Sequence, residues 1–271
     1  MGCVLQTLPY GQWIAGVTLL DALLYVLRED RSSNQIEVYD TDSYRLQRCL
    51  TVPGLRSGSD SYDITACSRN RCAYISDHIT SCVHRLALPD ADVTQWPVND
   101  KPASLSVTDA HCVLVTCGQV RKIKEFTTDG QLLRQLQLSK DVVSPWRAVQ
   151  LSGGKFIVCH GAFRDPLHRV CLVDPEGQVV QSYGGPPGSG DHEMNVPWHL
   201  AVDSSKFVYV ADLNNYRVLL LSPSVSYIRE VVSRDQLQGC PVRLCLDADK
   251  VRLYVAVNDS LSSGRIVVVS V

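Results

Sequence analysis

The sequence lacks the segments that a membrane-spanning or exported chain needs. No stretch of its 271 residues reaches 18 uninterrupted apolar residues, so no transmembrane helix is expected. The N-terminus, MGCVLQTLPYGQW, has no basic stretch followed by a long apolar run, so no secretory signal peptide is expected. The sequence therefore predicts a cytoplasmic chain without membrane contact.

The sequence also has no large excess of positive or negative charge. The chain carries 26 Lys and Arg against 28 Asp and Glu, which gives a net charge of -2. A protein with this balance has no basic field over its whole surface, although a local basic patch is compatible with a neutral total. Net charge alone therefore does not indicate nucleic-acid binding.

The cysteine pattern lacks the features of a secreted disulfide framework. The 11 cysteines are odd in number and scattered through strand-like segments, which favours reduced thiols in a reducing compartment. The spacing C-x4-C occurs three times, at Cys67/Cys72, Cys112/Cys117 and Cys240/Cys245. Structural zinc sites place such pairs in tight loops, whereas these pairs lie along or across strand-like segments. We therefore predict no metal and no other cofactor.

What the sequence does contain is a repeat, which the segment FVYVAD around Tyr209 shows most clearly. Related segments follow at intervals of 40 to 52 residues and are centred on Tyr25, Tyr74, Leu114, Ile157, Tyr209 and Tyr254. Each is preceded by one strand-like segment, such as PWHLAVD (197–203), and followed by another, such as RVLLLS (217–222). A turn and a fourth strand-like segment complete the unit, as in VVQSYG (179–184).

Six units of four antiparallel strands predict an all-β fold, a six-bladed β-propeller, in which each blade buries its faces against its neighbours. The single domain is expected to span 1–271, with blades at about 10–54, 55–98, 99–140, 141–185, 186–236 and 237–271 plus 3–8. The last unit has no fourth strand of its own, and CVLQTL (3–8) aligns with the fourth strands elsewhere. We therefore expect the N-terminal strand to close the ring.

The segment VPWHLAVDSSKFVYVADLNNYRVLLLS (196–222) closely resembles the NHL repeat, in which Pro, an apolar strand and Asp precede Tyr-Val-Ala-Asp, Asn and Arg-Val. The resemblance is specific across about 145–271 and weaker in the first three units. NHL propellers often form the C-terminal domain of tripartite-motif (TRIM-NHL) ubiquitin ligases, and some relatives bind RNA or are lyases and hydrolases. The resemblance implies a propeller that binds partners, with any ligase activity supplied by another protein.

Two positions of the repeat are candidates for binding. The residue that opens the third strand is basic in five of six units, but it can serve structure by pairing across the turn, as Arg217 with Asp212 or Arg85 with Asp77. The first strands open with an aromatic residue in four units (Trp13, Tyr62, Trp146 and Trp198), and the next residue is often polar. Because first strands line the axis of a propeller, these pairs should lie at one end of it, where Trp and Arg are favoured anchors.

Enzymatic interpretations find less support. A metal-dependent propeller lyase needs several histidines around the axis, and only His199 stands at a first-strand position. In that family the histidine directly follows the proline, where this chain has Trp198. Calcium-dependent hydrolysis would need carboxylates there, and only Asp63 qualifies. We therefore predict no catalytic residues, with a metal-dependent lyase or hydrolase as the least favoured alternative.

The function predicted from the sequence is a non-catalytic, monomeric binding module. Its partner is expected to be a protein, with a role as substrate adaptor in ubiquitin-ligase-type assemblies. RNA is the alternative, because aromatic residues beside arginines also suit stacking on unpaired bases. The long loops 159–169 and 184–195 should rise on the same face. Replacing Arg147 and Arg243 by Glu should weaken binding without unfolding the chain. The expected partner-binding residues are Trp146, Arg147, Trp198, His199, Arg243, Arg164, Arg217 and Arg28.

Overall fold

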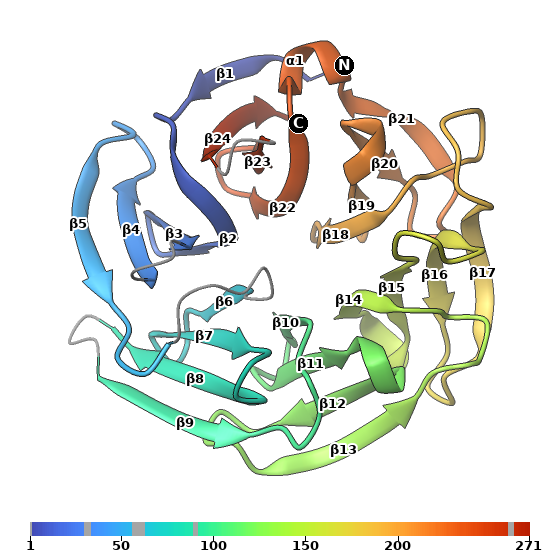
Figure 1. Ribbon diagram of the computed structural model, residues 1–271, viewed down its shortest axis with the longest axis horizontal. Coiled ribbons are helices and arrows are strands. Elements are labelled where there is room, and N and C mark those ends of the chain that lie inside the picture. The colour runs from blue at the N-terminus through green and yellow to red at the C-terminus, as the bar shows by residue number, and fades with distance from the viewer. Residues whose placement is uncertain (1, 30–33, 56–62, 89–91, 260–262) are drawn as a thin grey trace.

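Antiparallel strands make up nearly all regular structure in the described part of the chain. The computed structural model describes residues 2–29, 34–55, 63–88, 92–259 and 263–271. Tyr62, one of the aromatic residues expected at a strand entrance, lies outside them. Within these ranges the strands run in consecutive sets of four around a central axis, with the first strand of each set innermost (Figure 1).

The first three sets cover the N-terminal half. The first set contains β2 (Gly11–Leu20), β3 (Leu23–Glu29), β4 (Asn34–Asp40) and β5 (Leu46–Thr51). The second contains β6 (Ile64–Cys67), β7 (Cys72–Asp77), β8 (Cys82–Ala87) and β9 (Val93–Pro97). The third contains β10 (Ser104–Val107), β11 (Val113–Cys117), β12 (Lys122–Phe126) and β13 (Leu132–Gln137).

The other three sets complete the ring. The fourth contains β14 (Pro145–Gln150), β15 (Phe156–His160), β16 (His168–Val173) and β17 (Val179–Gly185). The fifth contains β18 (Pro197–Val202), β19 (Val208–Asp212), β20 (Arg217–Leu221) and β21 (Tyr227–Val232). The sixth combines β22 (Cys240–Asp247), β23 (Arg252–Asn258) and β24 (Ser263–Ser270) with β1 (Val4–Thr7). The one α-helix of the described residues is α1 (Arg234–Leu237).

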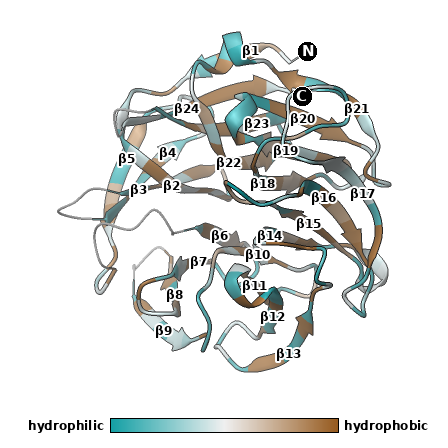
Figure 2. Cartoon of the chain, turned by 45° about the vertical axis from the view of Figure 1, so that its right-hand side comes forward, coloured by the Kyte–Doolittle hydropathy of each residue, from teal (hydrophilic) through white to brown (hydrophobic). Residues whose placement is uncertain are grey.

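Burial explains why the sequence segments recur. Second strands such as β19, with the sequence VYVAD, are buried at every residue because they lie inside a set and between two neighbouring sets. Fourth strands such as β13 are mostly exposed, because they form the rim. The described chain has six hydrophobic clusters, and each one lies between adjacent sets. Brown, apolar segments recur on the strands around the ring (Figure 2). This radial packing is that of a β-propeller, as the sequence predicted.

The N-terminal strand closes the ring, as expected. Val4 of β1 lies opposite Val269 of β24, in antiparallel pairing. The chain then stays on β24 beyond β1: the amide of Leu8 donates to the carbonyl of Ile266 at 2.9 Å, and Gly11 lies opposite Gly264. The closing strand therefore runs almost directly into β2, the innermost strand of the first set.

This continuity changes the number of separate blades. Six separate blades were predicted, but the structure has four separate four-stranded sheets and one eight-stranded sheet that unites the first and sixth sets. The two sets are joined where β2 pairs with β24 through Gly11 and Gln12. Of the six predicted four-stranded blades, four are therefore separate sheets, and the first and sixth share one sheet because the chain passes from rim to axis while still hydrogen-bonded to β24.

The cysteines are free thiols, and several of them are buried. This holds for all 11, and burial raises the pKa of Cys159 and Cys171 to about 12. The helical segments of the described residues are too short or too polar to cross a membrane.

Candidate functional site

A shared irregularity shapes the innermost strands of the last three sets. The ladder shifts by one residue between Pro145 and Arg147 in β14, between Pro197 and His199 in β18, and between Pro241 and Arg243 in β22. Such β-bulges insert an extra residue and redirect the neighbouring side chains. The extra residues are Trp146, Trp198 and Val242.

The bulges bring two tryptophans together at the end of the axis where these strands begin, which we call the entrance face. The ring centroids of Trp146 and Trp198 are 3.9 Å apart, and the ring planes are inclined by 31°. The indole N–H of Trp146 donates to the carbonyl of Gly161 at 3.2 Å, which ties the ring to the loop after β15. Two neighbouring sets thus contribute one half-buried aromatic surface.

A cavity of about 300 Å³, which we call the entrance pocket, opens beside this aromatic pair. It draws residues from the second to the sixth sets: His78, Lys101, Ala103, Ser104, Gly118, Gln119, Ser144, Pro145, Trp146, Ala162, Trp198, His199 and Arg243. A pocket of this volume is at the small end of those that hold ligands. It is therefore suited to one side chain or a small group.

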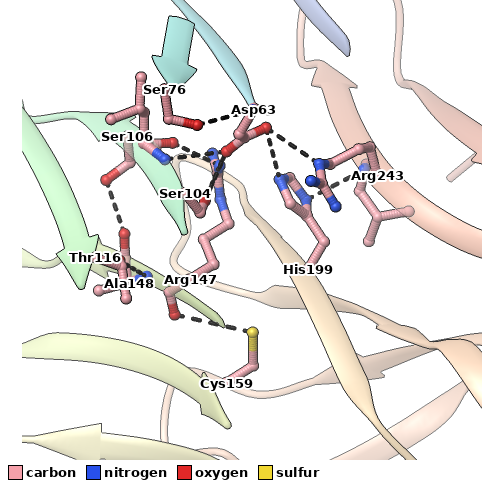
Figure 3. Close-up of polar contacts among 12 residues, drawn as sticks. Asp63, Ser76, Ser104, Ser106, Thr116, Arg147, Ala148, Cys159, His199 and Arg243 are labelled. Carbon is pink, nitrogen blue, oxygen red and sulfur yellow. Dashed lines mark hydrogen bonds and ion pairs between the residues drawn. The ribbon is translucent and has the colours of Figure 1, made fainter. Parts of the chain in front are cut away.

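The carboxylate of Asp63 lies at the centre of a buried polar cluster next to the pocket (Figure 3). Its Oδ2 accepts hydrogen bonds from Nη1 of Arg147 at 2.8 Å and from the hydroxyl of Ser104 at 2.6 Å. Its Oδ1 is 3.3 Å from Nε of Arg243 and 3.7 Å from Nε2 of His199. One side chain of the second set thereby connects to the third, fourth, fifth and sixth sets.

The charges in this cluster fix its protonation states. Burial opposes ionisation of Asp63, but the positive charge of Arg147, with the contributions of His199 and Arg243, outweighs it and holds the pKa of the carboxyl well below its usual range. Burial, reinforced by the charge of Arg147, lowers the pKa of His199 to about 3. At neutral pH the cluster therefore contains one carboxylate, two guanidinium groups and a neutral imidazole.

The geometry gives these groups structural roles rather than catalytic ones. Nδ1 of His199 accepts the backbone N–H of Leu244 at 3.2 Å, so the proton of the neutral ring is on Nε2, which faces Asp63. The hydroxyl of Ser104 donates a hydrogen bond to Asp63, whose lowered pKa makes it too weak a base to take the proton. The thiol of Cys159, with its pKa of about 12, points at the carbonyl of Arg147. None of these groups is activated as a nucleophile.

Metal binding was not expected from the sequence, and the described residues contain no group of three or more His, Cys, Asp or Glu side chains that could hold a metal ion. At the axis, the carboxylate that a metal would use is engaged by Arg147 and Arg243. The positive charge that neutralises this carboxylate therefore comes from two arginine side chains of the protein.

The structure brings together four of the eight predicted site residues, because Trp146, Trp198, His199 and Arg243 all line the entrance pocket. Arg147 lies beside it and is bound to Asp63. The other three, Arg164, Arg217 and Arg28, are not among the residues that line the pocket. Arg164 is exposed on the loop between β15 and β16, where its guanidinium lies 5.5 Å from the ring centroid of Phe163.

Arg28 and Arg217 are held by structural bonds. Arg28 is 1% exposed, pairs with Glu37 at 2.8 Å and donates to the carbonyls of Gln12 and Gly264, so its proposed place on a binding surface is wrong. Arg217 pairs with Asp212 at 2.8 Å, as the structural interpretation predicted. The corresponding pair of Arg85 with Asp77 does not form; Asp77 pairs with His84 at 3.2 Å.

The cluster also overturns one expectation about Arg147 and Arg243. The sequence suggested that both could be reversed to Glu without unfolding the chain. Their side chains are only 12% and 6% exposed, and both face the fully buried Asp63. Two added carboxylates would place three negative charges together away from water, so the double reversal is expected to unfold the protein.

Sequence reasoning missed His78, Lys101 and Gln119 as pocket residues, and it missed the exposed Phe163, which follows the pocket residue Ala162 in the chain. Lys101 directly precedes Pro102, just before the first strand of its set, so its position in the repeat was a usable signal. His78 and Gln119 lie in turns after second strands, and their approach to the axis depends on how the sets pack. Phe163 carried no pattern, because a single aromatic residue in a loop has no periodicity.

Comparison with known proteins supports the fold. No protein-family model matches the chain, and no curated protein matches it in sequence. Among solved structures, the WD40 β-propeller domain of Doa1 is 15% identical with a TM-score of 0.63, and the alignment covers 98% of this chain and 96% of that one. Virginiamycin B lyase from Staphylococcus aureus is 10% identical with a TM-score of 0.63, covering 97% and 98%.

A protein of unknown function from Bacteroides thetaiotaomicron is 14% identical, with a TM-score of 0.70 over 100% of this chain and 72% of that one. At such identities a structural match carries the fold and not the activity, and these neighbours include both an enzyme and a WD40 domain. The chain is accordingly an all-β protein with the β-propeller fold.

Proposed function

We propose that this protein is a non-catalytic binding module that recognises a protein partner through the entrance pocket. The observation that carries the proposal is the closely packed, tilted pair of Trp146 and Trp198 beside Arg243 and Lys101, in one cavity built by five of the six sets. Aromatic and arginine side chains in a partly enclosed pocket are the usual anchors of protein interfaces. A rigid ring with such a pocket can recognise a partner without any catalytic residue.

The finer assignment is an NHL-type propeller with six blades, in which the two halves of the eight-stranded sheet act as two blades. The six hydrophobic clusters between adjacent sets support this count. The NHL resemblance of the fifth set supports a role as substrate adaptor in ubiquitin-ligase-type assemblies, with the ligase activity in a partner.

A protein is favoured over RNA by the state of the arginines. An RNA surface was expected to use Arg28, Arg147, Arg164, Arg217 and Arg243. Arg28 and Arg243 are 1% and 5% exposed, and Arg147 and Arg217 are each paired with a buried carboxylate. Binding of a nucleic-acid backbone relies on accessible cations that replace counterions along several phosphates. Of the five, Arg164 is the one with an exposed side chain.

An enzymatic role at this site would need groups that the cluster uses otherwise. The lyase among the structural neighbours shares the fold at 10% identity. Here Nδ1 of His199 is bound to the backbone of Leu244, and the carboxylate of Asp63 is bound to two arginines. These contacts favour recognition over proton transfer.

The test uses one charge reversal in the pocket and a matched reversal on the other face. Lys101 is exposed and lines the pocket, whereas Lys155 is exposed beside the β14–β15 turn, at the opposite end of β14 from Pro145. The tagged full chain, K101E and K155E are used to capture partners from lysate, with and without nuclease. We expect nuclease-resistant protein partners that K101E loses and K155E keeps.

Two results would overturn the proposal. Partners that disappear after nuclease treatment would make the protein an RNA-binding propeller. Equal capture by K101E and the unmodified chain would place the binding surface outside the entrance pocket.

A further inference from the structure

We propose that the entrance pocket takes the carboxylate side chain of an acidic peptide segment, with an apolar neighbour of that residue resting on Phe163. This inference deepens the proposed function and depends on it for its biological meaning. It is carried by the charge of the pocket, by the shape of its aromatic wall and by the loop that presents Phe163.

The charge around the pocket is positive. Its ionisable lining residues are His78, Lys101, His199 and Arg243, and none of the described lining residues is acidic. The adjacent carboxylate, Asp63, lies between two guanidinium groups, at 2.8 Å from Arg147 and 3.3 Å from Arg243, so the buried cluster keeps a net positive charge. Burial and then the charge of Lys101 lower the pKa of His78, and Arg243 is buried and paired with Asp63, so Lys101 is the exposed cation among the described lining residues.

Lys101 differs from Lys124, a buried lysine on β12 of the same set. Lys124 is 5% exposed and is bound to Asp100 at 2.7 Å and to the carbonyl of Val98. Lys101 is exposed and projects at the pocket, where an incoming anion can reach it. A charge-assisted bond from Lys101 to a carboxylate would form in a partly enclosed site, where it is stronger than on an open surface.

The small number of accessible cations in the pocket favours a carboxylate over a phosphate. Phosphorylated motifs are usually read by clusters of arginines that match a double negative charge. Here Arg147 and Arg243 both already pair with Asp63, which leaves Lys101 as the exposed cation of the described lining residues. The indole faces of Trp146 and Trp198 provide an apolar wall for the methylene groups of an acidic side chain.

The loop between β15 and β16 holds an apolar anchor beside the pocket. Phe163 is 76% exposed, although its neighbour Ala162 lines the cavity. The loop is braced from within, since the amide of Ala162 donates to Asp165 at 2.7 Å and His168 bonds the carbonyl of Ala162 at 2.9 Å. Arg164 adopts a φ of 80°, which is uncommon for a residue with a side chain. A fixed, exposed aromatic ring can add apolar contact at little entropic cost.

The chain contains its own probes for a binding experiment. It has 4 tryptophans, so a sample with ¹⁵N-labelled tryptophan gives four indole N–H signals, which single Trp→Phe variants assign. Trp146 and Trp198 line the pocket, Trp13 lines a separate hollow, and Trp96 is buried between the second and third sets. A ligand in the entrance pocket should shift the first two signals and leave the other two in place.

The titrant is the acetylated and amidated pentapeptide Ala-Leu-Glu-Leu-Ala, compared with versions that carry Gln or phosphoserine in place of Glu. We expect the Glu peptide to shift the signals of Trp146 and Trp198, and the Gln peptide to bind at least roughly ten-fold more weakly, as the loss of a charge-assisted bond implies. K101E should weaken the Glu peptide by a similar factor, and K155E should leave it unchanged. F163A should weaken binding a few-fold, whereas the exposed rim variant V180A should not.

Several outcomes would overturn the inference. They are equal binding of the Glu and Gln peptides, tighter binding of the phosphoserine peptide, or the same peptide-induced shifts of the Trp146 and Trp198 signals in K101E as in the unmodified chain. The signals of Trp13 and Trp96 report whether K101E and F163A remain folded, so a folding defect is not mistaken for lost binding.

The peptide also separates this inference from the proposed function. If K101E abolishes capture of a protein partner but excess Glu peptide does not compete with that partner, the recognition module stands and the carboxylate assignment fails. If the peptide binds as expected but no protein is captured in a Lys101-dependent way, the pocket chemistry stands and the proposed function fails.

Discussion

Replacing Asp63 by Asn tests whether one buried carboxylate holds the ring together at its axis. The side chain is fully buried, and its partners Arg147 and Arg243 are only 12% and 6% exposed. The substitution keeps the shape and removes the charge, so two guanidinium groups lose their counterion away from water. Removing one partner of a buried ion pair costs about 3–5 kcal/mol. At about 2 °C per kcal/mol for a chain of this size, the melting temperature should fall by at least roughly 6 °C.

The assay is urea denaturation and thermal melting of D63N beside a matched control. Asp21 pairs with Arg71 at 3.2 Å, but the two side chains are 50% and 62% exposed, so D21N removes the same charge from an exposed pair. Such pairs contribute less than about 1 kcal/mol. If D63N loses no more stability than D21N, the cluster at the axis does not stabilise the ring and the reasoning is refuted.

Two further predictions concern ring closure and pH. Deleting residues 1–9 removes β1 and the buried Leu8 from β24, so the exposed strand edge should lower the melting temperature and promote aggregation, as light scattering after size-exclusion chromatography would detect; a monomeric variant with unchanged melting would contradict this. Burial, together with nearby arginine charges, lowers the pKa of His160 and His199 to about 3, from 6.5. As the pH falls, both histidines are therefore protonated in the unfolded chain before they are protonated in the folded one. The stabilisation that they provide is complete above pH 6.5, and the free energy of unfolding should fall by about 1.4 kcal/mol per pH unit and histidine between pH 6.5 and pH 3. Equal urea midpoints at pH 7 and pH 5 would contradict it.

Local patterns in the sequence were enough to predict the propeller. The apolar segments around Tyr74, Tyr209 and Tyr254 recur because second strands are buried between neighbouring sets, and burial demands the same residue types each time. The pairing of CVLQTL with the last strand followed from a missing fourth strand, since an unpaired edge is costly. The joining of the first and sixth sets was not predictable, because it depends on the path between Thr7 and Gly11 and not on strand content.

The sequence also determined which positions face the axis, and therefore that Trp146, Trp198, His199 and Arg243 would gather at one end of it. Only the tertiary structure decided which charges remain available there. Asp63 is 84 residues from Arg147 along the chain, and their contact at 2.8 Å exists because the ring brings the second and fourth sets to the same axis. The charge that a side chain presents to a partner depends on its neighbours in space. A repeat fixes the position of an arginine within its own set, but the packing of the sets decides whether another side chain has already neutralised it.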